Sequence, residues 1–182
     1  LSCSTDSGSG GDDPGGNNGG NNGGNNGGNN GGGNNTDDGS TDPDDYTDST
    51  SDGNTTYYVS FSSGNDTNDG KTETTPFKNL GKINSITFKA GDVVKFKKGD
   101  TWKGYFKIRG SGSEGSHITV DSYGSGNLPI IDGNGYQAGI FLENIENITI
   151  SNIEITNEAT HRKSDGSVKL MHSSDRNGQD ER

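Results

Sequence analysis

The sequence predicts an all-β fold, a parallel β-helix with three strands in each coil. Two observations carry this prediction. First, between residues 104 and 157 short β-branched runs alternate with segments rich in Gly, Asn and Ser. Second, the apolar pair Ile118 and Val120 is repeated later in the chain as Ile148 and Ile150, with the same separation within each pair. A repeat that contains only short strands is typical of a solenoid, in which each coil packs on the coil before it.

The repeat contains two sets of three expected strands. They are Tyr105–Ile108, His117–Val120 and Pro129–Asp132 in the first coil, and Gly139–Leu142, Ile148–Ser151 and Ile153–Thr156 in the second. Matching the runs pairs Ile108 with Ile140, Ile118 with Ile148, Val120 with Ile150, and Ile130 with Ile153. Because side chains alternate along a strand, Ile118 and Ile148 are expected in one shared core and Thr149 outside it.

The chain before the coils is divided near Tyr57. Residues 1–56 contain ten Asp but no Glu, Lys or Arg, and residues 15–35 are almost pure Gly and Asn. Such a segment buries too little apolar surface to offset its ordering entropy, so a disordered linker is expected there. Residues 57–182 are expected to form the N-terminal part of a longer β-helix domain, because no polar cap follows the second coil.

The opening residues LSCS resemble the end of a bacterial lipobox, in which the Cys becomes the lipid-modified N-terminus. Cys3 is the single cysteine of the chain, and a long polar tether follows it. Lipid attachment at Cys3 is therefore predicted, with the protein on the bacterial cell surface as an outer-membrane lipoprotein, or extracellular. The lipid would be the only membrane contact, because no apolar run approaches about 20 residues.

Two elements are expected between the linker and the first coil. A strand begins at Tyr57 and ends at a dense turn cluster, residues 63–70. A short helix is expected over residues 75–84, where Phe77, Leu80 and Ile83 lie at helical spacing. This helix would cap the first coil.

The folded part resembles the first coils of right-handed parallel β-helix proteins of the pectin lyase-like superfamily. The resemblance covers residues 57–157, on the segments YYVS, SGNDTNDG, FKAGDVVKFKKGDTW, ITVDSYGSGNLPIIDGNG and NITISNIEIT. Within the superfamily, secreted or surface-tethered proteins of polysaccharide-using bacteria are the most similar. The resemblance implies a right-handed coil and a pectate lyase-like activity. It assigns no catalytic residue, because those of the family lie on more central coils.

Basic residues are the candidates for contact with an anionic polysaccharide. Seven of them lie between residues 89 and 109, against two acids. The substrate-binding candidates are Lys95, Lys97, Lys103, Arg162 and Lys163. A positively charged patch attracts carboxylates. The alternative explanation, which we favour, is that outward lysines protect strand edges from pairing with other chains.

Asp66 and Asp69 are the metal candidates, because their oxygens suit Ca²⁺, the one cofactor considered. Their spacing misses the EF-hand order, so an Asx-type turn is the favoured explanation. His117, His161 and His172 lie at no zinc spacing. Nucleotide binding is not expected, because a strand follows the GSGSEG segment where the motif requires a helix.

Four aromatic residues, Tyr57, Tyr58, Trp102 and Tyr105, have two interpretations. They could stack on sugar rings, or they could fill the core beside the first coil. Core packing is favoured.

The leading functional hypothesis is a surface or secreted β-helix protein that acts on acidic polysaccharide. β-Elimination needs the uronate carboxylate neutralised and a base to remove the adjacent proton. Only the loop with His161, Arg162, Lys163 and Asp165 mixes suitable residue types, so the chain alone is expected to be inactive. The alternatives are a non-catalytic glycan-binding or adhesive β-helix and a purely structural surface repeat. A nucleic-acid partner is not expected, because the basic patch is short.

Overall fold

The computed structural model describes residues 46–169, which form an all-β unit with little helix, as predicted. The strands are β1 (Ser49–Thr50), β2 (Thr56–Val59), β3 (Ile86–Thr87), β4 (Val93–Lys97), β5 (Thr101–Lys103), β6 (Phe106–Ile108), β7 (Ile118–Tyr123), β8 (Ile130–Asp132), β9 (Ile140–Leu142), β10 (Ile148–Ile150) and β11 (Glu154–Thr156). The helices are α1 (Leu80–Asn84) and the 3-10 turn η2 (Ala159–His161). Neither helix in this part of the chain is long and apolar enough to span a membrane.

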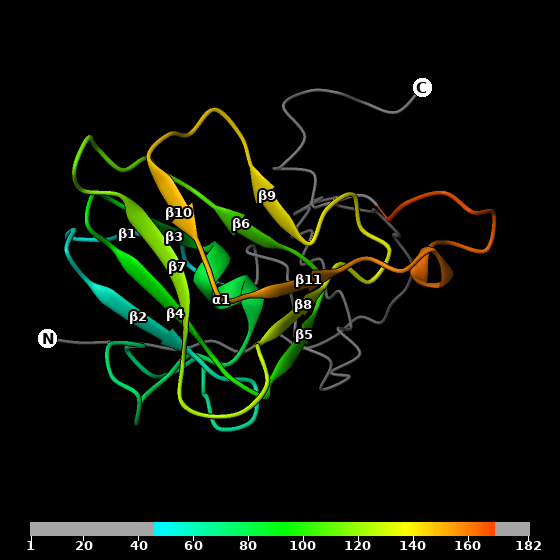
Figure 1. Cartoon of the computed structure of the whole chain (residues 1–182), viewed down its shortest axis with the longest axis horizontal. Helices are drawn as coiled ribbons and strands as arrows, with labels where there is room; N and C mark the ends of the chain where they lie inside the picture. The colour runs from blue at the N-terminus through cyan, green and yellow to red at the C-terminus, as the bar shows by residue number, and fades with distance from the viewer. Residues whose placement is uncertain (1–45, 170–182) are drawn as a thin grey trace, which may run out of the picture. The chain divides into compact units, whose positions relative to one another are not determined.

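The strands form four short sheets in which every pair is parallel (Figure 1). Their strand orders are β10-β7-β4-β2, β11-β8-β5, β6-β9 and β1-β3. Strands that follow one another in the chain lie in different sheets, and from β4 onward the chain visits the sheets of β4, β5 and β6 in turn and returns to each in the same order. Parallel neighbours therefore come from successive circuits of the chain, as parallel pairing requires a long crossover.

The structure confirms all three predicted strand pairings, but only one of the three predicted registers. In the β7–β10 pair, Ile118 lies opposite Ile148 and Val120 opposite Ile150. The other two predicted registers were wrong, because Ile108 lies opposite Leu142 and Ile130 opposite Glu154. The sequence separation between partners decreases from β6–β9 to β7–β10 and again to β8–β11. The first decrease in separation arises because the loop after β9 is shorter than the loop after β6. The second arises because β10 and the loop that follows it are together shorter than β7 and the loop that follows β7.

The core lies between the sheets and is built from aromatic and β-branched side chains. Phe96 is fully buried and contacts the rings of Trp102 and Phe106 edge-on, with centroids 5.1 and 5.2 Å apart. Tyr57 and Tyr105 are also buried, which confirms the core interpretation for both. Tyr58 differs, because strand alternation turns it to the outer face of its sheet, where it is half-buried.

The predicted capping helix is shorter than expected. The helix occupies only Leu80–Asn84, because Phe77 extends the sheet instead. The Phe77 amide donates to the Tyr58 carbonyl, and its carbonyl accepts from the Ser60 amide. Proline at position 76 leaves its preceding residue in an extended conformation, which suits this pairing.

Residues 46–51 lie against the folded unit, ahead of the expected boundary at Tyr57. Strand β1 pairs with β3, the Tyr46 hydroxyl donates to Asp66 at 2.8 Å, and Arg109 pairs with Asp48 at 2.9 Å. We call this segment the strap. Residues 1–45 of the expected linker, which include Cys3, lie outside the described residues.

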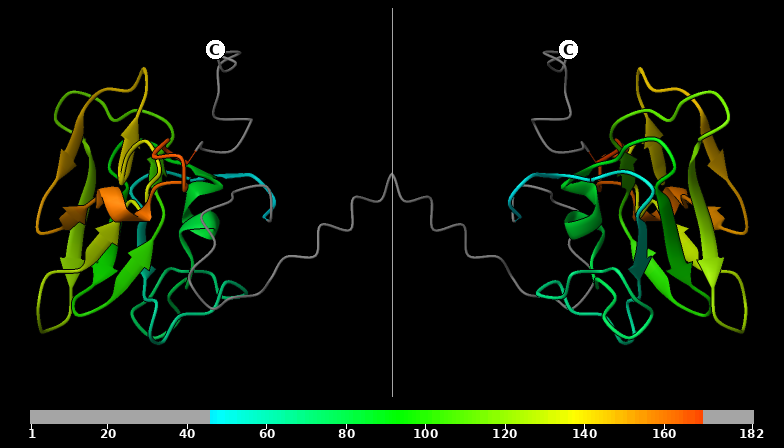
Figure 2. Two further views of the ribbon diagram at one scale, coloured as in Figure 1. Left: turned by 90° about the vertical axis from the view of Figure 1, so that its right-hand side faces the viewer. Right: turned by 90° about the vertical axis from the view of Figure 1, so that its left-hand side faces the viewer.

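The final strand of each of three sheets exposes an apolar side chain. Leu142 in β9, Ile150 in β10 and Ile155 in β11 are 46%, 36% and 50% exposed. By contrast, Ile118, Val120 and Ile131 on the inner strands are completely buried. Figure 2 shows these late strands, in yellow and orange, at one flank of the unit. Within the described part of the chain, each of these three strands has a neighbouring strand on one side only, so together they form an open edge of the core.

Candidate functional site

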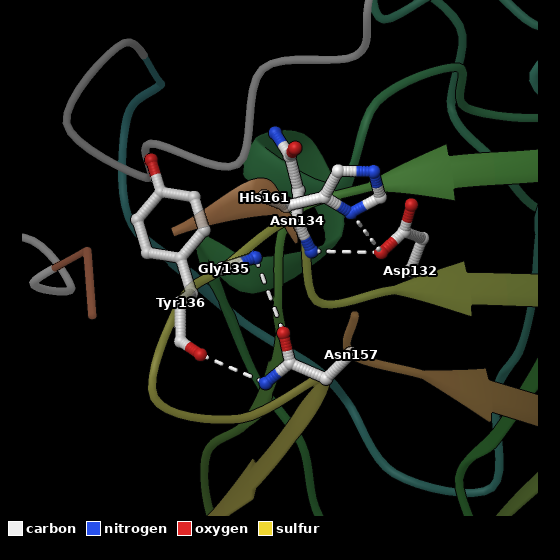
Figure 3. A network of polar contacts seen from close by, with 6 residues as sticks. All are labelled: Asp132, Asn134, Gly135, Tyr136, Asn157 and His161. Carbon is white, nitrogen blue, oxygen red and sulfur yellow. Dashed lines mark hydrogen bonds and ion pairs between the residues drawn. The ribbon is translucent and has the colours of Figure 1, made fainter. Parts of the chain in front are cut away.

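A network of polar side chains surrounds the end of strand β8, where the chain turns toward β9 (Figure 3). Its members are Asp132, Asn134, Gly135, Tyr136, Asn157 and His161. They come from the β8 end, the turn that follows it, the residue after β11, and η2. Successive circuits of the chain bring them together, although three strands and their loops separate the turn from Asn157 in sequence.

One half of the network is a carboxylate that meets an imidazole. The Asn134 amide donates to Asp132 Oδ1 at 2.9 Å, and His161 Nδ1 lies 3.4 Å from the same oxygen. The His161 nitrogen is enclosed and makes no hydrogen bond. The 3.4 Å contact between His161 Nδ1 and Asp132 Oδ1 is too long for a normal N–H···O hydrogen bond, so it is an electrostatic contact. It becomes an ion pair when the imidazole is protonated.

The other half is an asparagine that bridges two backbone groups of the turn. Asn157 Oδ1 accepts from the Gly135 amide at 3.1 Å, and Nδ2 donates to the Tyr136 carbonyl at 2.8 Å. The close packing needs glycine at position 133, where an added Cβ would lie 2.7 Å from Asn157 Cγ. Gly135 adopts φ +81°, and a Cβ there would collide with the His161 carbonyl. The sequence DGNG is thus specific for this turn.

The chemical capacity of the network is that of one carboxylate, one imidazole and neutral amides. Lys103 in β5 and Thr156 in β11 lie in register with Asp132 on either side of β8. Within residues 46–169, no group of three or more His, Cys, Asp or Glu side chains is placed to hold a metal ion. The network holds the turn through Asp132 and Asn157 and places His161 beside the Asp132 carboxylate.

Removing the Asp132 carboxylate should loosen this turn. We expect Asp132→Ala to lower the free energy of unfolding by about 1–2 kcal/mol, because the backbone amide of Asn134 loses its acceptor and the His161 ring loses its contact with the carboxylate. Urea denaturation measures the loss, and hydrogen exchange should show faster exchange at Asn134. The matched control is Glu114→Ala, at an exposed position outside the network, which should change neither quantity. Equal stability of the two variants would contradict the role given to Asp132.

The basic residues predicted to bind substrate do not form one patch. Lys95 and Lys97 lie in β4, Lys103 lies in β5 of another sheet, and Arg162 with Lys163 follow η2. Lys97 Nζ donates to Ser63 Oγ at 3.1 Å. Of the five, Lys103 lies next in register to the network and the last two lie in the loop that carries His161.

The two carboxylates proposed for Ca²⁺ are both engaged in hydrogen bonds with the protein. Asp66 accepts the backbone amides of Lys78 and Asn79 at 2.8 and 3.0 Å, besides the Tyr46 hydroxyl. Asp69 accepts hydrogen bonds from the Lys71 amide and the Thr75 hydroxyl. Both bonds lower the pKa of the Asp69 carboxyl, and the bond from Lys71 has the larger effect. The Asp69 contact with the Lys71 amide is that of the favoured turn interpretation, whereas Asp66 bonds residues distant in sequence. His117 contacts Thr149, and His172 lies outside the described residues.

A second, buried group of polar residues lies at the ends of β2, β4 and β7. Asp100 is 8% exposed and accepts from the Ser60 hydroxyl at 2.9 Å and the Ser62 amide at 3.2 Å. Burial, followed by the charges of Asp100 and Glu73, raises the pKa of Tyr123 to about 12. The neutral phenol is therefore the form that the folded protein stabilises.

The shifted pKa of Tyr123 predicts a loss of stability in strong alkali. A phenol with a pKa near 10 when unfolded and about 12 when folded favours folding fully below pH 10. That contribution is lost as the pH rises from 10 to 12, because the unfolded state then releases the proton first. Thermal melts across this range should show a steeper decline for the wild type than for Tyr123→Phe. Parallel declines would contradict the shift.

The sequence interpretation singled out His161 but missed Asp132, Asn134, Tyr136 and Asn157. One signal was available, because the repeat aligns the ends of PIID and IEIT and so places residues 132 and 156 in neighbouring strands. The contact with His161 depends on the loop of residues 157–161, whose path the repeat does not specify.

The comparisons with known proteins point to one kind of enzyme. No family model matches the chain. A lacto-N-biosidase of Bifidobacterium longum subsp. longum is 32% identical over 140 residues, which cover 62% of this chain and 9% of that protein. Two crystal structures of a GH136 lacto-N-biosidase from Eubacterium ramulus, the selenomethionine derivative and the native protein, match with TM-scores of 0.54 and 0.53. Both are 28% identical and cover 57% of this chain and 20% of the solved chain.

These relatives correct the predicted family and function. The similar proteins are lacto-N-biosidases, so the assignment to the pectin lyase-like superfamily and the pectate lyase-like action on acidic polysaccharide were wrong. The short parallel sheets do not establish a pectin lyase-like β-helix either. The comparisons also give no support to a lipoprotein. The chain spans 9% of the length of the curated relative and 20% of the solved one.

Proposed function

We propose that this chain is part of a glycoside hydrolase of the lacto-N-biosidase kind, and that its partner is a neutral carbohydrate. The observation that carries the proposal is the agreement of sequence and structure comparisons, which separately lead to lacto-N-biosidases from two bacterial species. The two comparisons cover similar shares of the chain, 62% and 57%.

The proposal assigns this segment a binding and positioning role. Glycoside hydrolysis usually needs two carboxyl groups, about 5–5.5 Å apart in retaining enzymes and about 6.5–9.5 Å apart in inverting ones. The network of Figure 3 contributes one carboxylate, Asp132, which is already committed to Asn134 and His161. The catalytic pair is thus not assembled within this network, and the 182-residue chain alone should not hydrolyse glycosides.

We propose in addition that the sheets β10-β7-β4-β2, β11-β8-β5 and β6-β9 are the three faces of a right-handed parallel β-helix, to which each full coil contributes one strand per face. Support comes from the return of the chain to each sheet and from the strong preference of parallel crossovers for the right-handed path. Residues 57–169 would supply the first coils of that domain. The exposed Leu142, Ile150 and Ile155 are the side chains that a further coil would cover.

The proposed activity is tested on an intact protein that contains this chain. Its incubation with p-nitrophenyl lacto-N-bioside should release p-nitrophenol, whereas the 182-residue chain should release none. Polygalacturonate should give no unsaturated product with either protein. Absence of glycoside cleavage by the intact protein would overturn the proposal, and cleavage by the chain alone would overturn the binding role.

A further inference from the structure

The outer face of the β10-β7-β4-β2 sheet presents a row of three different side chains. Tyr58 in β2 lies opposite Lys95 in β4, which lies opposite Asp121 in β7. All three are half-buried and alternate along their strands with core residues. Neighbouring strands lie about 4.8 Å apart, so the row spans roughly 10 Å, comparable to the length of a disaccharide.

The aromatic member of the row is held in a fixed orientation. The ring of Tyr58 meets the ring of Tyr123 edge-on, with centroids 5.1 Å apart and an interplanar angle of 85°. Tyr123 is itself only 8% exposed, so it is a rigid support. A ring fixed before binding loses little conformational entropy when a ligand stacks on it, which improves affinity.

The acidic member is also fixed. Asp121 Oδ1 accepts the Ser122 amide and Asn152 Nδ2, both at 2.8 Å. Burial by itself would raise the pKa of this carboxyl, but the bonds from Asn152 and Ser122 and the charge of Lys95 outweigh it and lower the pKa. Asp121 is therefore a fixed anionic acceptor beside the cationic donor Lys95.

We propose that this face binds a neutral oligosaccharide, with one sugar ring stacked on Tyr58 and sugar hydroxyls bonded to Lys95 and Asp121. Sugar hydroxyls both donate and accept, so they match an ammonium group next to a carboxylate. An acidic sugar fits less well, because Asp121 compensates the charge of Lys95 and repels a uronate. This inference rests on the proposed function and assigns a saccharide contact distinct from the network around Asp132.

The test measures saccharide binding by the complete 182-residue chain. Isothermal titration with lacto-N-biose should show saturable binding, with digalacturonate binding more weakly. Tyr58→Ala should weaken lacto-N-biose binding at least tenfold and Asp121→Asn about fivefold. Tyr58→Phe keeps the ring and should bind like the wild type, which separates lost stacking from misfolding. Lys89→Ala, which changes an exposed lysine outside this row, is the matched control and should also bind normally.

Three outcomes would overturn the inference: no saturable binding, binding that Tyr58→Ala leaves unchanged, or tighter binding of digalacturonate. The result is separable from the test of the proposed function. If the chain fails to bind but the intact protein cleaves the lacto-N-bioside, only this inference falls. If Tyr58-dependent binding occurs and no glycoside is cleaved, the hydrolase proposal falls and the binding face stands.

Discussion

Replacing Ile118 with Asp is expected to abolish cooperative folding of the described unit. Ile118 is completely buried in β7, between β4 and β10, and its register partner is Ile148. A carboxylate at this position would lose its hydration without gaining a partner, at a cost of several kcal/mol. Because small domains are stable by only about 5–15 kcal/mol, this cost is comparable to the whole stability.

The neighbouring residue provides the control for this experiment. Thr119 precedes Val120 in the same strand, but strand alternation turns it to the outer face, where it is half-buried. Thr119→Asp should therefore keep a cooperative urea transition followed by far-ultraviolet circular dichroism, whereas Ile118→Asp should show none. A normal transition for Ile118→Asp would mean that the assignment of inner and outer faces is wrong.

The second large effect is expected at Trp102. Its side chain is completely buried, contacts Phe96 edge-on, and donates its indole N–H to the Lys78 carbonyl at 2.9 Å. Trp102→Ala should lower the free energy of unfolding by about 3–5 kcal/mol, because it removes a large apolar side chain and leaves a cavity. Urea denaturation followed by circular dichroism measures the loss, since Trp102 is the only tryptophan and its fluorescence disappears with it.

A conservative substitution divides this effect into two parts. Trp102→Phe keeps most of the ring contact with Phe96 but removes the N–H donor to Lys78, so a loss of about 1–2 kcal/mol is expected. A loss as large as that of Trp102→Ala would assign the stability to the hydrogen bond. A negligible loss in both variants would show that Trp102 is not central to the core.

The strands were predictable from the sequence because their signal is local. Alternation and β-branched residues located β7 and β10, and the equal spacing of Ile118 and Val120 with their partners fixed that register correctly. The β6–β9 register was mispredicted because Ile108 and Ile140 look equivalent in sequence, while the loops decide which residues meet. Loop length is set by turn geometry, which periodicity does not report.

The candidate site was only partly predictable because its contacts join distant segments. His161 was noticed as part of a mixed polar loop, but nothing local connects it with Asp132, which lies on the preceding circuit of the chain. The position of Tyr58 was also difficult to predict. Tyrosine is a residue type found in cores, but the alternation of side chains along β2 turns Tyr58 to the outer face. Function was mispredicted for a different reason, since strand patterns identify architecture and one architecture supports many activities.

The strap also determines how the unit would respond to mechanical tension applied through the preceding chain. Pulling would first load the Tyr46–Asp66 hydrogen bond, because Tyr46 is the first residue of the strap. The load would then pass to the Asp48–Arg109 pair, whose Asp48 side chain is 70% exposed and is therefore weakly held in salt solution, and to the short pairing of β1 with β3. These contacts lie outside the aromatic core, so they would yield in steps and lengthen the tether before the Phe96 and Trp102 packing bears any force.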